Sequence, residues 1–403
     1  MSRILIISSG SPCRNPRSLK EAETLGRAGH DVTLLTVSES PALDEMEHAL
    51  LIGASFRHES VGRNVGGVGK FLRRVRQRLA VQATIAGFPV LRALGQASLL
   101  RARALTLPAD LTIVHNEIPF WIGCDLMKLG RRVAADFEDW HSEDLLPEAR
   151  RGRPLAPLRK LEQQLLQKGA YTTTTSAALS AALAARYGAP APHVLTNSFP
   201  LQPDPHFGPP AAPPAFFWFS QTLGPGRGLE SFCDAWVQTK HPSRLVLLGD
   251  PSPGFAQVLL GRLPPEFAAR VSLQPLVSPT ELPSLIARHD IGLALEQSWI
   301  VNRDLTVTNK ILQYLNAGLA VVATPTAGQR EVLAKAPEAG RLIDLNAPTK
   351  AAAVLDKLCA DPAALAAAQN KARFAAETVF CWEREAPRLV EIVAAALARP
   401  VIQ

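Results

Sequence analysis

The sequence predicts an α/β protein with two doubly wound domains, each built on a parallel sheet. Short apolar runs alternate with longer amphipathic or Ala-Leu-rich stretches along the chain, which is the pattern of strand–helix–strand units. A length of 403 residues is more than one ordinary core fills, and two cores of similar size fit it well. The alternation also stops in a proline-rich stretch and then restarts, which separates the two domains.

The first domain is expected at 1–200. Its first strand is the apolar run Arg3–Ser8, and an expected helix at 18–28 leads to a second strand at 31–37. The remaining apolar runs of this half predict strands near 54–58, 111–115, 132–136, 171–176 and 193–197.

A linker is expected at 201–214, because seven prolines lie between Pro200 and Pro214 and stiffen a stretch with little apolar content. The second domain follows at 215–378. Its apolar runs predict strands at 216–220, 244–248, 271–273, 290–295 and 319–323. The tail is helical with a break near 379–382, so 379–403 forms a separate last helix.

The basic charge is concentrated in one segment. Residues 61–107 hold nine Arg or Lys and no Asp or Glu, which exceeds the net charge of +7 for the whole chain. Within it, 69–80 predicts a helix with Phe71 and Leu72 on one face and arginines around the others. Such a helix suits an anionic membrane surface, and an ordinary amphipathic helix packed on the sheet is the alternative. Nucleic acid is not expected, since no aromatic platform accompanies the charges.

Cysteine usage and hydropathy indicate a cytoplasmic location. The five cysteines are scattered and form no C-x-x-C pair, which argues against a disulfide framework or a zinc site. The apolar run after Arg3 is too short for a secretion signal. No stretch reaches the roughly 20 apolar residues of a membrane-spanning helix, so we expect a cytoplasmic protein, at most peripheral on the inner face of the plasma membrane.

The first candidate ligand site is the glycine-rich stretch after the strand at 216–220. Gly224, Gly226 and Gly228 allow backbone N–H groups to approach a ligand, and a helix begins at about Leu229. A helix start of this kind favours an anion, and Arg227 adds a full positive charge. The alternative is a Gly-Pro turn with a solvated arginine.

The second candidate site is the helix that begins after Thr308 and ends before Gly318. Thr308 is interpreted as the N-cap and Gly318 as the residue after the helix end. Asn309 and Lys310 then lie in the first turn, where the helix dipole disfavours a cation. We therefore expect an anion shared by Lys310 and the helix terminus; the alternative is a surface lysine.

Polar residues also end two expected strands of the first domain. The segment Asp136-Phe-Glu-Asp-Trp-His141 follows one strand, and His115 ends its neighbour. Glu138, Asp139 and His141 are therefore candidates for a general base or a charge-stabilising carboxylate. A solvated acidic loop is the alternative.

Four segments resemble, in order, the GT-B glycosyltransferases of the "glycosyl transferases group 1" type. They read NPRSLKEAETLGRAGHDVTLLT, FFWFSQTLGPGRGLESFCDAW, RHDIGLALEQ and TNKILQYLNAGLAVVATP. The resemblance covers most of the chain except 39–110. It implies two Rossmann-like domains facing a central cleft, with the last helix, 379–403, crossing back to the first domain.

The resemblance also implies roles for residues. Arg227 matches the second of two basic residues that hold the donor diphosphate, whereas the first position is Thr222. Gln313 stands where the second of two glutamates is usual, and the first position is Leu305. Lys310 replaces the missing cation, and Glu296 is a further donor-side candidate. In the first half, Glu138 stands where the family has His, and Asn15 and Arg17 belong to the loop after the first strand.

The function implied is transfer of a sugar from a nucleotide-sugar donor to an acceptor hydroxyl on a glycan or lipid-linked molecule, as in bacterial polysaccharide synthesis. We expect retention of configuration, with Arg227 and Lys310 stabilising the leaving diphosphate; inversion would require a base such as Asp139. The nucleotide sugar is a substrate, and neither a cofactor nor a metal is expected, because the DxD signature is absent. The alternatives are a sugar-nucleotide epimerase of GT-B shape and a non-catalytic nucleotide-sugar-binding module.

Overall fold

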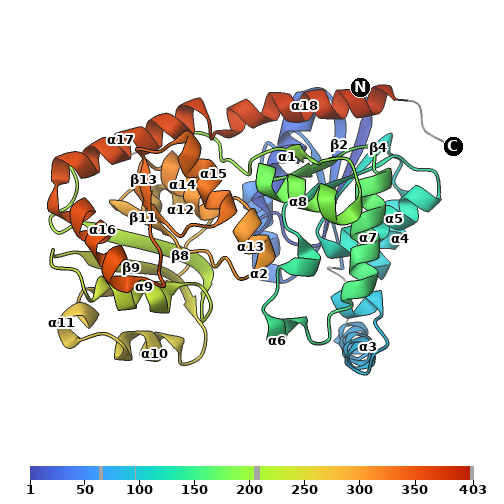
Figure 1. Ribbon diagram of the computed structural model, residues 1–403. Coiled ribbons are helices and arrows are strands. Elements are labelled where there is room, and N and C mark those ends of the chain that lie inside the picture. Colours follow the sequence, from blue (N-terminus) through green and yellow to red (C-terminus); the bar gives the residue numbers. More distant parts are fainter. Residues whose placement is uncertain (63–66, 96, 204–208, 400–403) are drawn as a thin grey trace. The chain divides into compact units, whose positions relative to one another are not determined.

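The computed structural model describes residues 1–403 except 63–66, 96, 204–208 and 400–403. It divides the chain into two compact units (Figure 1). Unit 1 contains Met1–Leu195 and Ala386–Gln403, and unit 2 contains Thr196–Glu385. The division after Leu195 comes before the proline-rich stretch interpreted as a linker, of which 204–208 lie outside the described residues.

Unit 1 has a parallel sheet of seven strands in the order β3-β2-β1-β4-β5-β6-β7. Its strands are β1 (Arg3–Ser8), β2 (Asp31–Val37), β3 (Arg57–Val61), β4 (Leu111–His115), β5 (Val133–Phe137), β6 (Thr172–Thr174) and β7 (His193–Val194). Its helices are α1 (Pro16–Arg27), α2 (Pro41–Leu50), α3 (Gly67–Ile85), α4 (Ser98–Thr106), α5 (Glu117–Lys128), α6 (Pro147–Arg150), α7 (Leu155–Lys168) and α8 (Ala177–Tyr187), with short 3₁₀ turns η1 (Leu91–Leu94) and η2 (His141–Glu143). The third strand begins three residues later than the expected start at 54.

Unit 2 repeats this topology with six parallel strands in the order β10-β9-β8-β11-β12-β13. The strands are β8 (Ala215–Leu223), β9 (Arg244–Pro251), β10 (Val271–Gln274), β11 (Ile291–Ala294), β12 (Ala320–Ala323) and β13 (Gly340–Leu342). The helices are α9 (Leu229–Trp236), α10 (Phe255–Gly261), α11 (Pro265–Ala268), α12 (Leu282–Ile286), α13 (Val301–Leu305), α14 (Asn309–Asn316), α15 (Ala327–Lys335), α16 (Pro348–Ala360) and α17 (Pro362–Thr378).

The apolar residues of β8 explain why the sheet of unit 2 is covered on both faces. Successive side chains of a strand point to opposite faces. Phe216 and Trp218 accordingly belong to one buried cluster with helices α9 and α16, whereas Phe217 belongs to another with α14 and α17. A run with apolar residues at every position is the sequence of a strand buried on both sides.

The last helix, α18 (Trp382–Ala398), belongs to both units. It begins in unit 2, and from Ala386 onward its residues group with unit 1 (Figure 1, red). Leu389 and Val393 are fully buried, and Arg388 donates to the Val194 carbonyl oxygen at 2.8 Å. Among the described residues, no helix combines the length and the apolar content that crossing a membrane requires.

In both units the strand order reverses at the first strand of the sheet, between β1 and β4 and between β8 and β11. In sheets of this kind the carboxyl ends of the strands beside such a reversal form the ligand-binding edge. The sequence-predicted residues are therefore considered below at these two edges, one unit at a time.

Candidate functional site

The glycine-rich turn of unit 2 starts later than the sequence suggested. Strand β8 continues through Leu223, so the turn consists of Gly224–Gly228 before α9 begins. Gly226 and Gly228 have φ of 72° and 78°, in the left-handed region that favours glycine. A Cβ on Gly228 would lie 2.6 Å from the Leu295 carbonyl oxygen, at the end of the adjacent strand. This glycine therefore lets the turn pack directly against the neighbouring strand end.

Lys310 lies in the first turn of α14 but is paired with a protein carboxylate. Its Nζ is 2.8 Å from Glu296 Oε1, and the two side chains are only 13% and 9% exposed. Burial by itself raises the pKa of Glu296, yet Lys310, Arg303 and Arg227 together hold it below its ordinary value. Lys310 is thus not a surface lysine, and Glu296 links it electrostatically to Arg227.

Arg303 is a third cation of this cluster that sequence reasoning missed. It lies on the short helix α13, and its Nη1 donates to the Gly226 carbonyl oxygen at 3.1 Å. The contact joins α13 to the glycine-rich turn next to Arg227. No local motif marks Arg303, because its partner is 77 residues away in the chain.

Two polar atoms near the start of α14 lack partners. Thr308 is the N-cap residue of the helix, as expected, but its side chain makes no capping hydrogen bond, and its buried Oγ1 has no partner. The buried Oε1 of Gln313, one turn along, has none either. Buried polar atoms are nearly always hydrogen-bonded, so these two oxygens are the groups of α14 best suited to a bound ligand. Asn309, by contrast, accepts a hydrogen bond from Asn197 at 2.7 Å.

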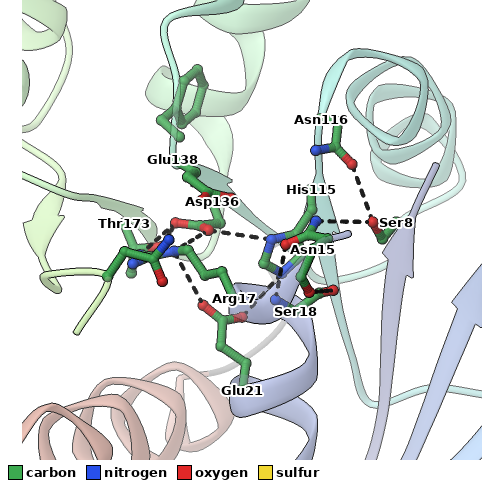
Figure 2. A network of polar contacts seen from close by, with 12 residues as sticks. Ser8, Asn15, Arg17, Ser18, Glu21, His115, Asn116, Asp136, Glu138 and Thr173 are labelled. Carbon is green, nitrogen blue, oxygen red and sulfur yellow. Dashed lines mark hydrogen bonds and ion pairs between the residues drawn. The ribbon is translucent and has the colours of Figure 1, made fainter. Parts of the chain in front are cut away.

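In unit 1, Arg17 is a buried helix residue and not part of a loop. It lies in the first turn of α1, is fully buried, and forms a two-pronged ion pair with Asp136 at 2.5 and 2.8 Å (Figure 2). It also donates to the Leu195 carbonyl oxygen at 2.8 Å. The expectation that Arg17 belongs to the loop after the first strand is wrong, since the helix begins one residue earlier, at Pro16.

His115 joins Asp136 to a second carboxylate, Glu21. Its Nε2 is 3.0 Å from Glu21 Oε2, and its Nδ1 is 3.2 Å from Asp136 Oδ2 (Figure 2). Burial lowers the pKa of His115, but the two carboxylates outweigh that effect and raise it to about 10. The side chain is therefore a cation at neutral pH, and with Arg17 it balances the two negative charges.

Glu21, His115 and Asp136 also offer three ligand atoms within 4.8 Å of one another, close enough to hold a metal ion. Spacing in the sequence gave no sign of this group, because the three residues come from α1, β4 and β5. A metal would have to compete with Arg17 and with Thr173, which donates to Asp136 Oδ1 at 2.7 Å. The donor set is thus already arranged as an ion-pair network, and it fits a metal poorly.

The other sequence-predicted residues of unit 1 surround this network. Asn15 caps α1 by accepting from the Ser18 N–H, and its Nδ2 donates to Ser8 Oγ at 3.1 Å. Glu138 and Asp139 follow β5 directly and are half-buried. Burial, reinforced by the Asp139 carboxylate, raises the pKa of Glu138 to about 7.

His141 begins η2 and packs edge-on against Phe120, with ring centroids 5.3 Å apart. Burial lowers its pKa to about 4, so the imidazole is neutral at neutral pH. Glu138 is therefore the predicted acidic residue whose protonation changes near neutrality.

Comparison with known proteins agrees with this architecture. Residues 214–361 match the family model described as "Glycosyl transferases group 1". No curated protein matches the sequence significantly. The match covers most of unit 2, and together with the two parallel sheets it confirms the resemblance to the GT-B glycosyltransferases of this type.

Solved structures extend the likeness to the whole chain. Sucrose-phosphate synthase from Thermosynechococcus elongatus is 15% identical, with a TM-score of 0.71 over 99% of this chain and 100% of its own. Anabaena HepE, solved in complex with UDP-glucose, is 15% identical, with a TM-score of 0.67 over 98% and 100%. Staphylococcus aureus TarM, solved with UDP, has a TM-score of 0.71 at 9% identity over 99% and 100%.

Proposed function

We propose that the chain transfers a sugar from a uridine diphosphate sugar to an acceptor hydroxyl, with unit 2 binding the donor and unit 1 the acceptor. The observation that carries the proposal is the pair of unpartnered oxygens on α14, Thr308 Oγ1 and Gln313 Oε1, beside three clustered cations. The complexes of HepE with UDP-glucose and of TarM with UDP support the choice of nucleotide.

The diphosphate would lie near Arg227, Arg303 and Lys310. Glu296 pairs with Lys310, and Arg303 and Arg227 also lower the pKa of this carboxyl, so three cations act at one place. Fixed cations of this kind stabilise the charge that develops as the sugar–phosphate bond breaks. Together with the helix termini they supply the role that a metal ion performs in other transferases, so we propose a metal-independent reaction.

We propose that the configuration at the anomeric carbon is retained. In that case the donor reacts as an oxocarbenium-like species, and the cations of unit 2 stabilise the leaving diphosphate. If the enzyme inverts instead, we propose Asp139 as the base that takes the acceptor proton, because Glu138 is largely protonated at slightly acid pH. The product's anomeric configuration, read by NMR, distinguishes the two.

Donor binding is tested by thermal unfolding with UDP-glucose in EDTA. At about 100 times Kd, Tm should rise by about 5 °C or more, because ligand binding to the folded state alone adds about 2.7 kcal/mol. Gln313→Leu should weaken binding about five- to tenfold, the worth of one hydrogen bond, without lowering Tm in the absence of ligand. Gln257→Leu, on the exposed face of α10, is the matched control.

The absence of any thermal response to UDP, UDP-glucose and other sugar nucleotides would overturn the donor site. Binding followed by release of free sugar, with no acceptor required, would indicate an epimerase. Binding without any turnover would indicate a nucleotide-sugar-binding module. A requirement for a divalent cation would overturn metal independence while leaving the donor site in place.

We further propose that the acceptor is a glycan or a lipid-linked molecule of bacterial surface synthesis, and that the protein is cytoplasmic and binds an anionic membrane surface through α3. Phe71, Leu72 and Leu79 of this helix are 65%, 49% and 64% exposed, beside the exposed Arg74 and Arg78. An exposed apolar face with flanking arginines is the pattern of a helix that lies in a membrane interface.

Vesicle sedimentation tests the membrane proposal. The chain should bind vesicles containing phosphatidylglycerol and be released by salt, since each basic residue contributes about 1 kcal/mol at low ionic strength. Phe71→Ser with Leu72→Ser should weaken the partitioning about tenfold or more. Phe374→Ser, at an apolar residue of α17 that is 61% exposed, is the control. Equal partitioning of both variants would show that α3 is not the contact.

A further inference from the structure

Unit 1 contains a recess of about 620 Å³ that shares no residue with the Arg17–Asp136 network. It is lined by residues of α3, η1, α4 and α5. Small-molecule sites typically enclose about 300–1,000 Å³, so the recess has room for a metabolite-sized group. None of the site residues predicted from the sequence lines it.

The charge in this recess is positive. Arg76, Arg92 and Arg101 line it together with a single acidic residue, Asp125. Asp125 is already engaged, because its carboxylate is 2.9 Å from Arg101 Nε and 3.1 Å from Lys128 Nζ. Within the described part of the chain, Arg76 and Arg92 have no acidic partner, although they lie at one recess. Two such guanidinium groups favour an anion with several oxygens.

The wall of the recess adds an apolar surface. Trp121, a half-buried residue of α5, lines it beside the arginines. An aromatic wall with a few polar groups is the usual composition of a site for a small organic molecule. The combination therefore suits an organic phosphate better than inorganic phosphate alone.

We propose that this recess binds a phosphate ester, with the phosphate between Arg76 and Arg92 and the organic part against Trp121. Two sources share that chemistry: a soluble sugar phosphate and the phosphate headgroup of a lipid. The site is separate from the donor groups of unit 2, and the inference does not depend on the proposed transferase reaction.

Isothermal titration of the full chain tests the site. Glucose 6-phosphate should bind saturably to the wild type, and glucose should not. The double variant Arg76→Ala/Arg92→Ala should bind glucose 6-phosphate about tenfold more weakly or worse, because charge-assisted hydrogen bonds to phosphate are lost. Arg186→Ala is the control: this arginine is exposed on α8 and does not line the recess, and the variant should bind as the wild type does.

Further probes identify the source of the phosphate. Tighter binding of dihexanoylphosphatidylglycerol than of glucose 6-phosphate, lost in the same double variant, assigns the recess to a lipid headgroup; the reverse order assigns it to a soluble sugar phosphate. Equal binding by the wild type and the double variant would overturn the site. An equal loss in Arg186→Ala would also overturn it, and so would the absence of saturable binding of either probe. Binding of UDP-glucose is measured in a separate titration. A negative result there would contradict the donor site in unit 2 but not the recess in unit 1.

Discussion

At the scale of single residues, the buried Arg17 side chain ties helix α1 to the end of strand β5 and to Leu195. Its guanidinium contacts Asp136, lies 3.9 Å from Glu21 and donates to the Leu195 carbonyl oxygen. Removing one member of such a network leaves an uncompensated buried charge, which is more costly than replacing the whole set with apolar residues. The network therefore fixes the strand ends that carry Glu138 and Asp139.

Glu138 leads to a prediction about pH. A carboxyl whose pKa is raised to about 7 in the folded state, from about 4.3 in the unfolded chain, binds its proton more tightly when folded. It stabilises the fold below about pH 4, and this contribution is lost as the pH rises through 7. Urea unfolding from pH 4.5 to 8 should show a steeper fall in the free energy of unfolding for the wild type than for Glu138→Gln.

An exposed glutamate provides the comparison. Glu148→Gln, at an exposed position of α6, should leave the wild-type pH profile unchanged. Identical profiles for wild type and Glu138→Gln would mean that burial and Asp139 do not raise this pKa.

The residue-scale predictions from sequence succeeded where the signal was local. Thr308 occupies the N-cap position of its helix, although its side chain makes no capping hydrogen bond, and Gly318, with φ of 73°, follows the helix end. Both positions depend on neighbouring residues. The pairing of Arg17 with Asp136, 119 residues away, has no local signature. The sequence correctly predicts Lys310 in the first turn of its helix. Its ion pair with Glu296 could not be predicted, because that pair depends on how β11 and α14 pack side by side.

At the scale of elements, the turn between β8 and α9 leads to a second prediction. Gly228 and Gly254 have the same φ of 78° and both precede a helix, α9 and α10. A Cβ on Gly228 would meet the Leu295 carbonyl oxygen at 2.6 Å, whereas one on Gly254 meets nothing within 4 Å. Both substitutions to Ala carry the left-handed penalty of about 1–2 kcal/mol.

Gly228→Ala should therefore destabilise the chain by about 1–3 kcal/mol more than Gly254→Ala, the usual cost of overpacking. Chemical denaturation measures the difference directly. Gly228→Ala should also weaken UDP-glucose binding, which Gly254→Ala leaves intact. Equal stability losses would show that the turn can move away from β11 without cost.

Element boundaries could be predicted where apolar runs were long, and less well elsewhere. The strands β1, β2 and β4 have the expected bounds because charged or polar residues flank their apolar runs. The three-residue strand β13 was not predicted, since its sequence Gly-Arg-Leu has no periodicity to recognise. Strand β8 extends three residues beyond the expected end, because Thr222 and Leu223 pair with β9 after an irregularity.

At the scale of the whole molecule, α18 completes unit 1 with residues from the other end of the chain. Its residues from Ala386 onward belong to unit 1, and Leu389, Val393 and Ala396 are at most 2% exposed. Deleting 386–403 should uncover this apolar contact in unit 1 while leaving the core of unit 2 intact. The burial of two large aliphatic side chains alone contributes about 3–6 kcal/mol to the free energy of unfolding of unit 1.

Calorimetry and limited proteolysis test this expectation. The truncated chain should show a lower melting transition for unit 1, with cleavage concentrated in residues 1–195, and UDP-glucose should still stabilise unit 2. As a control, Arg384→Ala, before the boundary, should leave unit 1 unchanged. Uniform loss of stability in both units would show that they unfold as one.

The same helix has a consequence for protein synthesis. Residues 1–195 of unit 1 are translated before unit 2, yet residues 386–403 of the same unit are translated only after all of unit 2. Domains generally fold as units during synthesis. The early sheet must therefore wait until α18 has been translated before its last apolar contact is covered. A nascent chain stalled before residue 386 thus exposes a surface that chaperones recognise, while the second sheet is already complete.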